Sequence, residues 1–207
     1  MNSMLIKIIS PFKSWFTVDQ RVLGIYRIFL GSLIFVDIFR RWDTRHIFYS
    51  ANGVYPSSSS ASVYKSFSLL HTFNSTWEIN LFFIIGMFFS ILLIIGYKTK
   101  LSHLISAVIL ISLHNRVILV ENAGDFVLNC MVVWTFFLPL GSAISLDSLK
   151  NSLKTLNDSN TDDLNNESDS SIPSNHCSIA YFAVLFQISA IYFFTGLNKT
   201  GADWMSG

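Results

Sequence analysis

Long apolar segments separated by short polar ones dominate the chain. A helix that crosses a membrane needs about 20 mostly apolar residues, and five stretches approach that length. They are Arg21 to Phe39, Ile79 to Gly96, Leu101 to Val120, Asp125 to Leu140, and Ile179 to Leu197. None is flanked by the turn-rich alternation of barrel strands. The pattern therefore predicts an all-α fold, a polytopic helical membrane bundle with about five transmembrane helices.

The segments outside these spans differ in character. Residues 1–18 carry apolar side chains interrupted by Lys7 and Lys13, which is typical of an amphipathic helix on the membrane surface. Residues 145–176 hold acidic side chains among Ser and Asn, with almost no aromatic residues. They predict a disordered acidic linker before the last span. The membrane domain is thus divided into residues 19–144, with the first four spans, and residues 177–207.

Composition supports a membrane protein and excludes other classes. Hydrophobic residues make up 51% of the 207 residues and charged residues 13%, whereas soluble domains carry about 25% charged residues. The net charge of +1 offers no basic face for phosphates, so we expect no nucleic-acid partner. Cys130 and Cys177 have no metal or redox spacing, and no metal is expected.

The first span carries two charged side chains, Arg27 and Asp37. Each would cost about 2.5 to 3.5 kcal/mol at the membrane centre, so each must pair, face the bundle or lie near an end. Asp37 is close to Arg40 and Arg41 and suits a boundary. Gly24 and Gly31 lie on either side of Arg27, and we expect them to let a neighbouring helix approach closely.

A second group of polar residues ends the third span. His114, Asn115 and Arg116 are followed by Glu121, Asn122 and Asp125. Charges of both signs therefore collect at one turn, and two interpretations stay open. The residues form either a structural ion-pair network or part of a functional site.

The last span delivers Lys199, Asp203 and Trp204 to the point where a helix meets water. An ammonium that is desolvated at such a boundary can have a lowered pKa and act as a base. Lysine and tryptophan also anchor the ends of ordinary membrane helices. Both interpretations are compatible with the spacing.

Five spans place the polar groups on opposite faces of the membrane. The 40–77 loop, the 114–125 turn and Lys199 share one face, and the N-terminus, Lys98 and Lys100 share the other. A slight excess of positive charge on the second face predicts a cytoplasmic N-terminus. We expect an integral membrane protein.

Several motifs, in order along the chain, resemble the HTTM (horizontally transferred transmembrane) domain. This is the transmembrane domain of the vitamin K-dependent γ-carboxylase and its bacterial relatives. The matching segments are Tyr26-Arg27-Ile28-Phe29-Leu30-Gly31 with Asp37-Ile38, Gly53-Val54-Tyr55-Pro56, Gly96-Tyr97-Lys98-Thr99, the turn from His114 to Asp125, and the ending Tyr192-Phe193 to Gly196-Leu197-Asn198-Lys199 and Ala202-Asp203-Trp204. The ending is the most specific of them.

The resemblance implies a reaction and a site. Carboxylases of this family oxidise a reduced naphthoquinone with O2, and the base formed removes a γ-proton from a peptide glutamate before CO2 adds. Lys199 falls on the family lysine that deprotonates the quinol. The resemblance implies Lys199 and Asp125 as catalytic residues. The pocket would be shaped by Arg27, Asp37, His114, Arg116, Asp203 and Trp204. Reduced vitamin K or menaquinol would be the cofactor, and the bacterial relatives imply a place in the bacterial inner membrane.

Two departures from the family pattern bear on this assignment. Asp125 stands where the carboxylase has a histidine that assists its chemistry, and a carboxylate donates a proton only if its pKa is raised. The family domain also continues beyond Met205-Ser206-Gly207, so we expect a truncated domain.

Two functions therefore remain as hypotheses, and whether the chain is an enzyme stays open between them. The first is a quinol-dependent membrane enzyme, carboxylase- or epoxidase-like, acting on a glutamate-containing peptide, and it predicts that Lys199 faces the bundle. The second is a non-catalytic membrane protein for maturation, export or immunity of a secreted peptide, and it predicts an exposed Lys199.

Overall fold

The computed structural model describes residues 17–50, 53–54, 67–73, 75–159, 175–197 and 199. Most of this part of the chain is helical. The elements are β1 (Thr17–Asp19), α2 (Gln20–Arg40), α3 (Arg45–Phe48), η1 (Leu69–His71), α5 (Thr76–Ile95), α6 (Thr99–Arg116), η2 (Ile118–Val120), α7 (Ala123–Thr135), α8 (Leu146–Ser159), β2 (Asn175–Cys177) and α9 (Ile179–Leu197).

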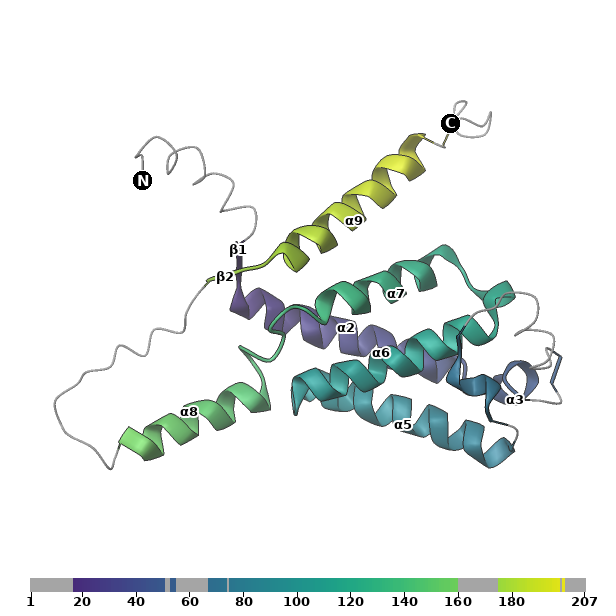
Figure 1. Cartoon of the computed structure of the whole chain (residues 1–207), viewed down its shortest axis with the longest axis horizontal. Coiled ribbons are helices and arrows are strands. Elements are labelled where there is room, and N and C mark those ends of the chain that lie inside the picture. Colours follow the sequence, from purple (N-terminus) through teal and green to yellow (C-terminus); the bar gives the residue numbers. More distant parts are fainter. Residues whose placement is uncertain are drawn as a thin grey trace.

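Four helices, α2, α5, α6 and α7, lie alongside one another and form a bundle (Figure 1). Helix α9 packs on α7 and diverges from the bundle, whereas α8 extends away from it near the start of α6 (Figure 1). Strands β1 and β2 pair antiparallel, with Thr17 opposite Cys177. This short pairing joins the starts of α2 and α9 and was not predicted from the sequence.

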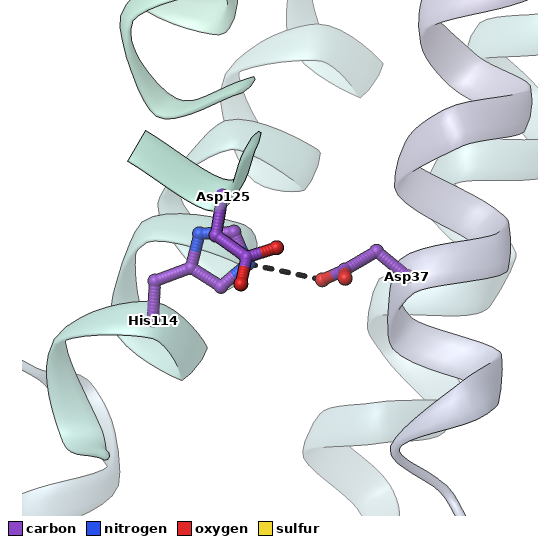
Figure 2. Close-up of side chains that lie close together, drawn as sticks. All are labelled: Asp37, His114 and Asp125. Atoms are coloured by element: carbon purple, nitrogen blue, oxygen red, sulfur yellow. Dashed lines mark hydrogen bonds and ion pairs between the residues drawn. The ribbon is translucent and has the colours of Figure 1, made fainter. Parts of the chain in front are cut away.

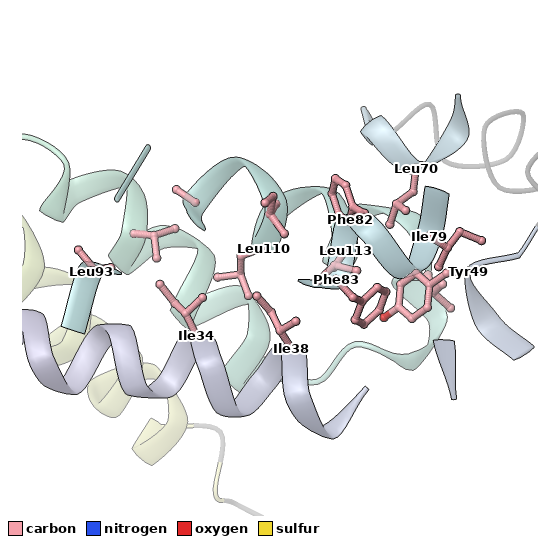
Figure 3. Close-up of a cluster of buried hydrophobic side chains, with 14 of the residues drawn as sticks. Ile34, Ile38, Tyr49, Leu70, Ile79, Phe82, Phe83, Leu93, Leu110 and Leu113 are labelled. Carbon is pink, nitrogen blue, oxygen red and sulfur yellow. The ribbon is translucent and has the colours of Figure 1, made fainter. Parts of the chain in front are cut away.

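The apolar core lies where α2, α5 and α6 meet (Figure 3). Ile34 and Ile38 of α2 face Phe83 of α5 and Leu110 of α6, and all four are almost completely buried. Tyr49, which follows α3, packs edge-on against Phe83 with ring centroids 5.4 Å apart. Burial of these large side chains is the main stabilising contact between α2, α5 and α6, and it holds in place the ends of α2 and α6 that carry the polar residues described below.

Close helix packing depends on Gly31, as the sequence predicts. A Cβ atom on Gly31 would lie 2.8 Å from Ile94 and 3.3 Å from the Ser90 carbonyl oxygen, so α2 and α5 approach at this glycine. The prediction for Gly31 is confirmed. At Gly24 the close neighbour is instead the carbonyl oxygen of Ala143, at 2.8 Å, in the connection between α7 and α8. The segment that approaches Gly24 is therefore not a helix.

Three of the described helices, α2, α5 and α9, are long and apolar enough to cross a membrane. Together with the helical bundle, they confirm an all-α integral membrane protein. Helix α6 ends at Arg116, and α7 has only 13 residues. Both end several residues before the predicted boundaries, because 3₁₀ and turn structure replaces helix near Ile118 and before Pro139. The count of five spans stays a prediction.

The predicted linker differs from the structure over its first part. Residues Leu146–Ser159 form helix α8, whereas residues 160–174 and the interfacial segment 1–16 lie outside the described residues. The start of α8 is fixed by Asp147, whose carboxylate accepts hydrogen bonds from the Lys98 and Thr99 backbone N–H groups at 2.9 and 2.7 Å. Leu146, Leu149 and Leu153 then recur at helical spacing, which favours a helix over a linker.

Candidate functional site

A cluster of charged side chains lies where the end of α2, the end of α6 and the start of α7 meet. Figure 2 shows Asp37 on α2 facing His114 on α6 and Asp125 on α7. Their side chains offer ligand-type atoms within 4.8 Å of one another. All three residues are buried, with 7%, 2% and 5% of their surfaces exposed. We call these residues, with Arg41 and Glu121, the polar cluster.

Local sequence places three members of the polar cluster. Asp37 and Arg41 are four residues apart, so both side chains lie on one face at the end of α2. Asn122 begins α7 by accepting hydrogen bonds from the Gly124 and Asp125 backbone N–H groups. Asp125 returns the contact by accepting the Asn122 N–H at 3.0 Å. This capping box fixes the start of α7 and points Asp125 toward α2.

Ion pairs connect the three elements. Arg41 donates to Asp37 at 3.1 Å and to Glu121 at 2.9 Å, and its guanidinium lies 3.3 Å from Asp125. Arg40, which is half exposed, lies 2.9 Å from Asp37 and 3.3 Å from Asp125. Each buried carboxylate therefore has an arginine partner, as a buried charge requires. An ion-pair network is therefore present, and its cations are Arg40 and Arg41 at the end of α2.

His114 is held between α2 and α7. Its Nε2 lies 3.0 Å from Asp37 Oδ2, and its Nδ1 lies 2.8 Å from Asn129 Oδ1. Asn129 is four residues after Asp125, so α7 presents both side chains on one face. Because each ring nitrogen faces an oxygen atom, either nitrogen can donate a hydrogen bond. The imidazole thus connects a carboxylate on α2 to an amide on α7.

Arg41 and Tyr49 shift each other's pKa values. Burial alone would lower the pKa of Arg41, but the nearby Tyr49, Asp37 and Glu121 raise it above its ordinary value. Arg41 also donates to the Tyr49 hydroxyl at 3.1 Å. Burial raises the pKa of Tyr49, and the Arg41 charge opposes that shift. Arg41 is therefore a permanent cation that links the cluster to the segment after α3.

Among the described residues outside the helices, Glu121 has a carboxyl group whose pKa is strongly shifted. Burial raises its pKa to about 7, the charges of His114 and Arg41 act in the opposite direction, and Asp125 adds to the rise. Its Oε2 accepts no hydrogen bond within the described part of the chain. A carboxyl group with this pKa changes its protonation near neutral pH, which makes Glu121 suitable for proton transfer.

The raised pKa of Glu121 predicts a stability that depends on pH. Because the folded-state pKa of about 7 lies above the ordinary 4.5, the contribution of Glu121 is complete below pH 4.5 and is lost as the pH rises through about 7. Glu121→Gln is expected to remove this loss, which amounts to about 1–3 kcal/mol. Chemical unfolding in detergent across this range measures it. Asp43→Asn, at an exposed acid, should leave the slope unchanged, and equal slopes for the parent and Glu121→Gln would contradict the assignment.

The spacing of Asp37, His114 and Asp125 also meets the requirement of a metal site. Their carboxylate oxygens already pair with Arg40 and Arg41. A divalent cation would have to replace these arginine contacts and lie close to two positive charges, which costs free energy. The charge balance therefore favours an ion-pair network over a metal centre.

A groove of about 290 Å³ runs beside the polar cluster between α2 and α7. Asp37, Arg40 and Asp125 line its polar part, and apolar side chains line the rest. The apolar residues are Leu33, Val36, Val127, Leu128 and Met131. The volume is near the lower end for small-molecule sites. Such a lining suits a flat, lipid-soluble molecule that carries a hydroxyl group at one end.

Arg27 lies apart from the polar cluster, although the sequence grouped it with the pocket. It is ten residues before Asp37 on the same helix, a rise of about 15 Å. Its guanidinium donates to the carbonyl oxygens of Leu140, Ile94 and Ile144 at 3.2, 3.3 and 2.7 Å. Arg27 is completely buried. In this position its hydrogen bonds connect α2 to α5 and to the segment before α8.

Comparison with known proteins identifies the family. The model of the HTTM domain matches residues 15–207. The chain belongs to the HTTM domain family. Neither the curated proteins nor the solved structures include a match to it. The family name also implies the relation to vitamin K-dependent carboxylase.

The HTTM lysine motif follows the last helix. Lys199 comes two residues after the end of α9, and its backbone N–H donates to the Gly196 carbonyl oxygen at 3.2 Å. Its side chain is exposed, and Lys199 is not among the residues that line the groove. Asp203 and Trp204 lie outside the described residues. Arg116 is buried at the last residue of α6, two residues after His114.

Three residues of the site were not named as catalytic or pocket residues from the sequence, although Glu121 was grouped with the charges at the end of the third span. Arg41 forms an ion pair with Glu121, and the side chain of Asn129 is hydrogen-bonded to the ring of His114. The i,i+4 spacing of Asp37 and Arg41 could have indicated their ion pair. The four-residue spacing of Asp125 and Asn129 could have indicated that Asn129 lies on the same face of α7 as Asp125.

Proposed function

We propose that this HTTM protein is a quinol-dependent membrane enzyme of the carboxylase or epoxidase type. The observation that carries the proposal is the groove beside the polar cluster, where carboxylates and an apolar wall meet. A naphthoquinol is apolar over its ring and polar at its hydroxyl groups, so it fits both parts of this lining. When bound, it supplies the reducing electrons for O2.

The residues of the groove have separate roles in this proposal. Leu33, Leu128 and Met131 receive the ring, and they keep water from it. Asp37 and Asp125 accept hydrogen bonds from hydroxyl groups. Arg40 neutralises the negative charge that remains after deprotonation, because its guanidinium is already within 3.3 Å of both carboxylates. The peptide partner of this reaction would carry glutamate.

The proposed base is Lys199, on the strength of its place in the family motif. The fold supports one part of this assignment. Helices α2 and α6 end, and α7 begins, at the polar cluster, and α9 runs in the opposite direction to α7 while diverging from the bundle (Figure 1). The order of spans predicts that Lys199 shares a membrane face with the groove, and the opposite directions of α7 and α9 support that prediction.

The second candidate function is a non-catalytic role in the maturation, export or immunity of a secreted peptide. One observation favours it. The Lys199 side chain is exposed, and the residues of the groove do not include it. That is the arrangement expected if the lysine anchors a helix end.

Lys199→Ala decides between the two functions. The parent chain in membranes supplied with O2 and reduced vitamin K or menaquinone is expected to form quinone epoxide, detected by chromatography. Lys199→Ala is expected to lower the rate at least about 100-fold, the usual contribution of a general base. Lys154→Ala, at an exposed lysine on α8, serves as the control.

The other results are equally informative. Epoxide that persists in Lys199→Ala would remove the lysine from the base role and leave Asp37 and Asp125 as candidates. No epoxide from the parent, with the protein folded and inserted, would count against the quinol reaction and favour the non-catalytic role.

A further inference from the structure

A second hollow lies at the opposite end of the bundle from the polar cluster. It has a volume of about 500 Å³ and lies between the turn from α5 to α6 and the connection from α7 to α8. Lys98 and Lys100 line it together with the polar residues Ser142 and Asn151 and the apolar residue Leu101. Neither the candidate site nor the family motif residue Lys199 uses it.

The charges around this hollow favour an anion. Lys98 and Lys100 have exposed side chains. Asp147 also lines the hollow, but its carboxylate is engaged by the Lys98 and Thr99 backbone N–H groups and by the Thr99 hydroxyl. Burial alone would raise the pKa of Asp147, but those hydrogen bonds and the charge of Arg27 lower it. The site therefore rests on the two lysines and not on the start of α6, whose N–H groups are already occupied.

An apolar strip leads away from the hollow along α6. Leu101, Leu104 and Val108 are exposed by 48%, 45% and 40%, and their spacing places them on one face of the helix. Helix α6 begins at the turn that carries the lysines, so the strip starts beside them and runs toward the opposite membrane face. A ligand with an anionic end and a long apolar part matches this arrangement.

We propose that the hollow binds the phosphate headgroup of an anionic phospholipid. Lys98 and Lys100 contact the phosphate, Ser142 and Asn151 supply further polar contacts, and an acyl chain lies along the strip on α6. The distribution of positive charge predicts that this face is cytoplasmic, and anionic lipids give the cytoplasmic leaflet a negative surface potential. This site is independent of the quinol reaction proposed above.

Native mass spectrometry of the full chain in mixed micelles tests the proposal. The probes are phosphatidylglycerol and phosphatidylcholine with the same acyl chains. Phosphatidylglycerol is expected to bind about tenfold more tightly, and Lys98→Gln with Lys100→Gln is expected to abolish that preference. The matched control is Lys150→Gln with Lys154→Gln, which removes the same charge from α8 and should keep the preference. The melting temperature of each variant in detergent shows that it is folded.

Three results would overturn the proposal. Equal binding of the two lipids by the folded parent would exclude a site for anionic headgroups. An equal loss in both double variants would show diffuse attraction and not a site in the hollow. Inorganic phosphate that displaces the lipid at equal concentration would identify a soluble anion as the ligand, because a lipid held by the strip should resist it.

Discussion

Asp37→Asn is expected to lower the free energy of unfolding by about 3–5 kcal/mol, the usual cost of removing one partner of a buried ion pair. Asp37 is 7% exposed and accepts from Arg41, while its Oδ2 also lies 3.0 Å from His114 Nε2. Asparagine keeps the shape of the side chain but removes the charge. The Arg41 guanidinium then stays buried with less compensation.

Denaturant titration in mixed micelles measures this effect. Asp43→Asn changes an exposed acid six residues along the chain and should shift stability by less than about 0.5 kcal/mol. A loss for Asp37→Asn that is no larger than for Asp43→Asn would show that the polar cluster does not stabilise the fold.

Gly96→Ala is expected to destabilise the protein by about 2–5 kcal/mol. Gly96 ends α5 with φ of +77°, a left-handed conformation that costs L-residues about 1–2 kcal/mol. A Cβ atom there would lie 2.5 Å from Arg27 Nη1 and 2.5 Å from Ser145 Cβ. Arg27 cannot withdraw easily, because three carbonyl oxygens hold it. Overpacking of this kind adds about 1–3 kcal/mol.

The control is a second glycine-to-alanine substitution, which is expected to raise stability. A Cβ atom on Gly196 meets nothing within 4 Å, and the residue lies inside α9. Gly196→Ala is therefore expected to stabilise the helix by up to about 1 kcal/mol. Thermal melting of both variants in detergent tests the pair. A Gly96→Ala melting temperature equal to that of the parent would mean that the junction at Arg27 is not tightly packed.

The helices of the bundle could be predicted from the sequence because long apolar runs have few alternatives in a membrane. The pairing of Asp37 with Arg40 and Arg41 could be predicted too, since these residues are neighbours on one helix. The contact of Asp37 with His114 joins residues 77 positions apart. It depends on which faces of α2 and α6 meet, and no local pattern determines that.

Arg27 and α8 show two further limits of sequence reasoning. The partners of Arg27 are carbonyl oxygens, which every residue has, so no side-chain pattern marks them. In α8 the Ser, Asn and Asp residues suggested a solvated linker, whereas the leucine spacing and the contacts of Asp147 with α6 favour a helix. The tertiary contact that starts α8 joins residues 49 positions apart.

The order in which the chain is made has a consequence for insertion into the membrane. Helix α2 carries Arg27 and Asp37 and is the first described span to leave the ribosome. The Ile144 carbonyl that accepts from Arg27 follows 117 residues later, and His114 follows Asp37 by 77. Arg27 thus lacks its Ile144 partner while the early spans enter the bilayer, and a charge at the membrane centre costs about 2.5–3.5 kcal/mol. Asp37, in contrast, already lies 2.9 Å from Arg40 on the same helix. The full set of contacts that hold Arg27 and Asp37 can therefore form only after the chain has been made through residue 144.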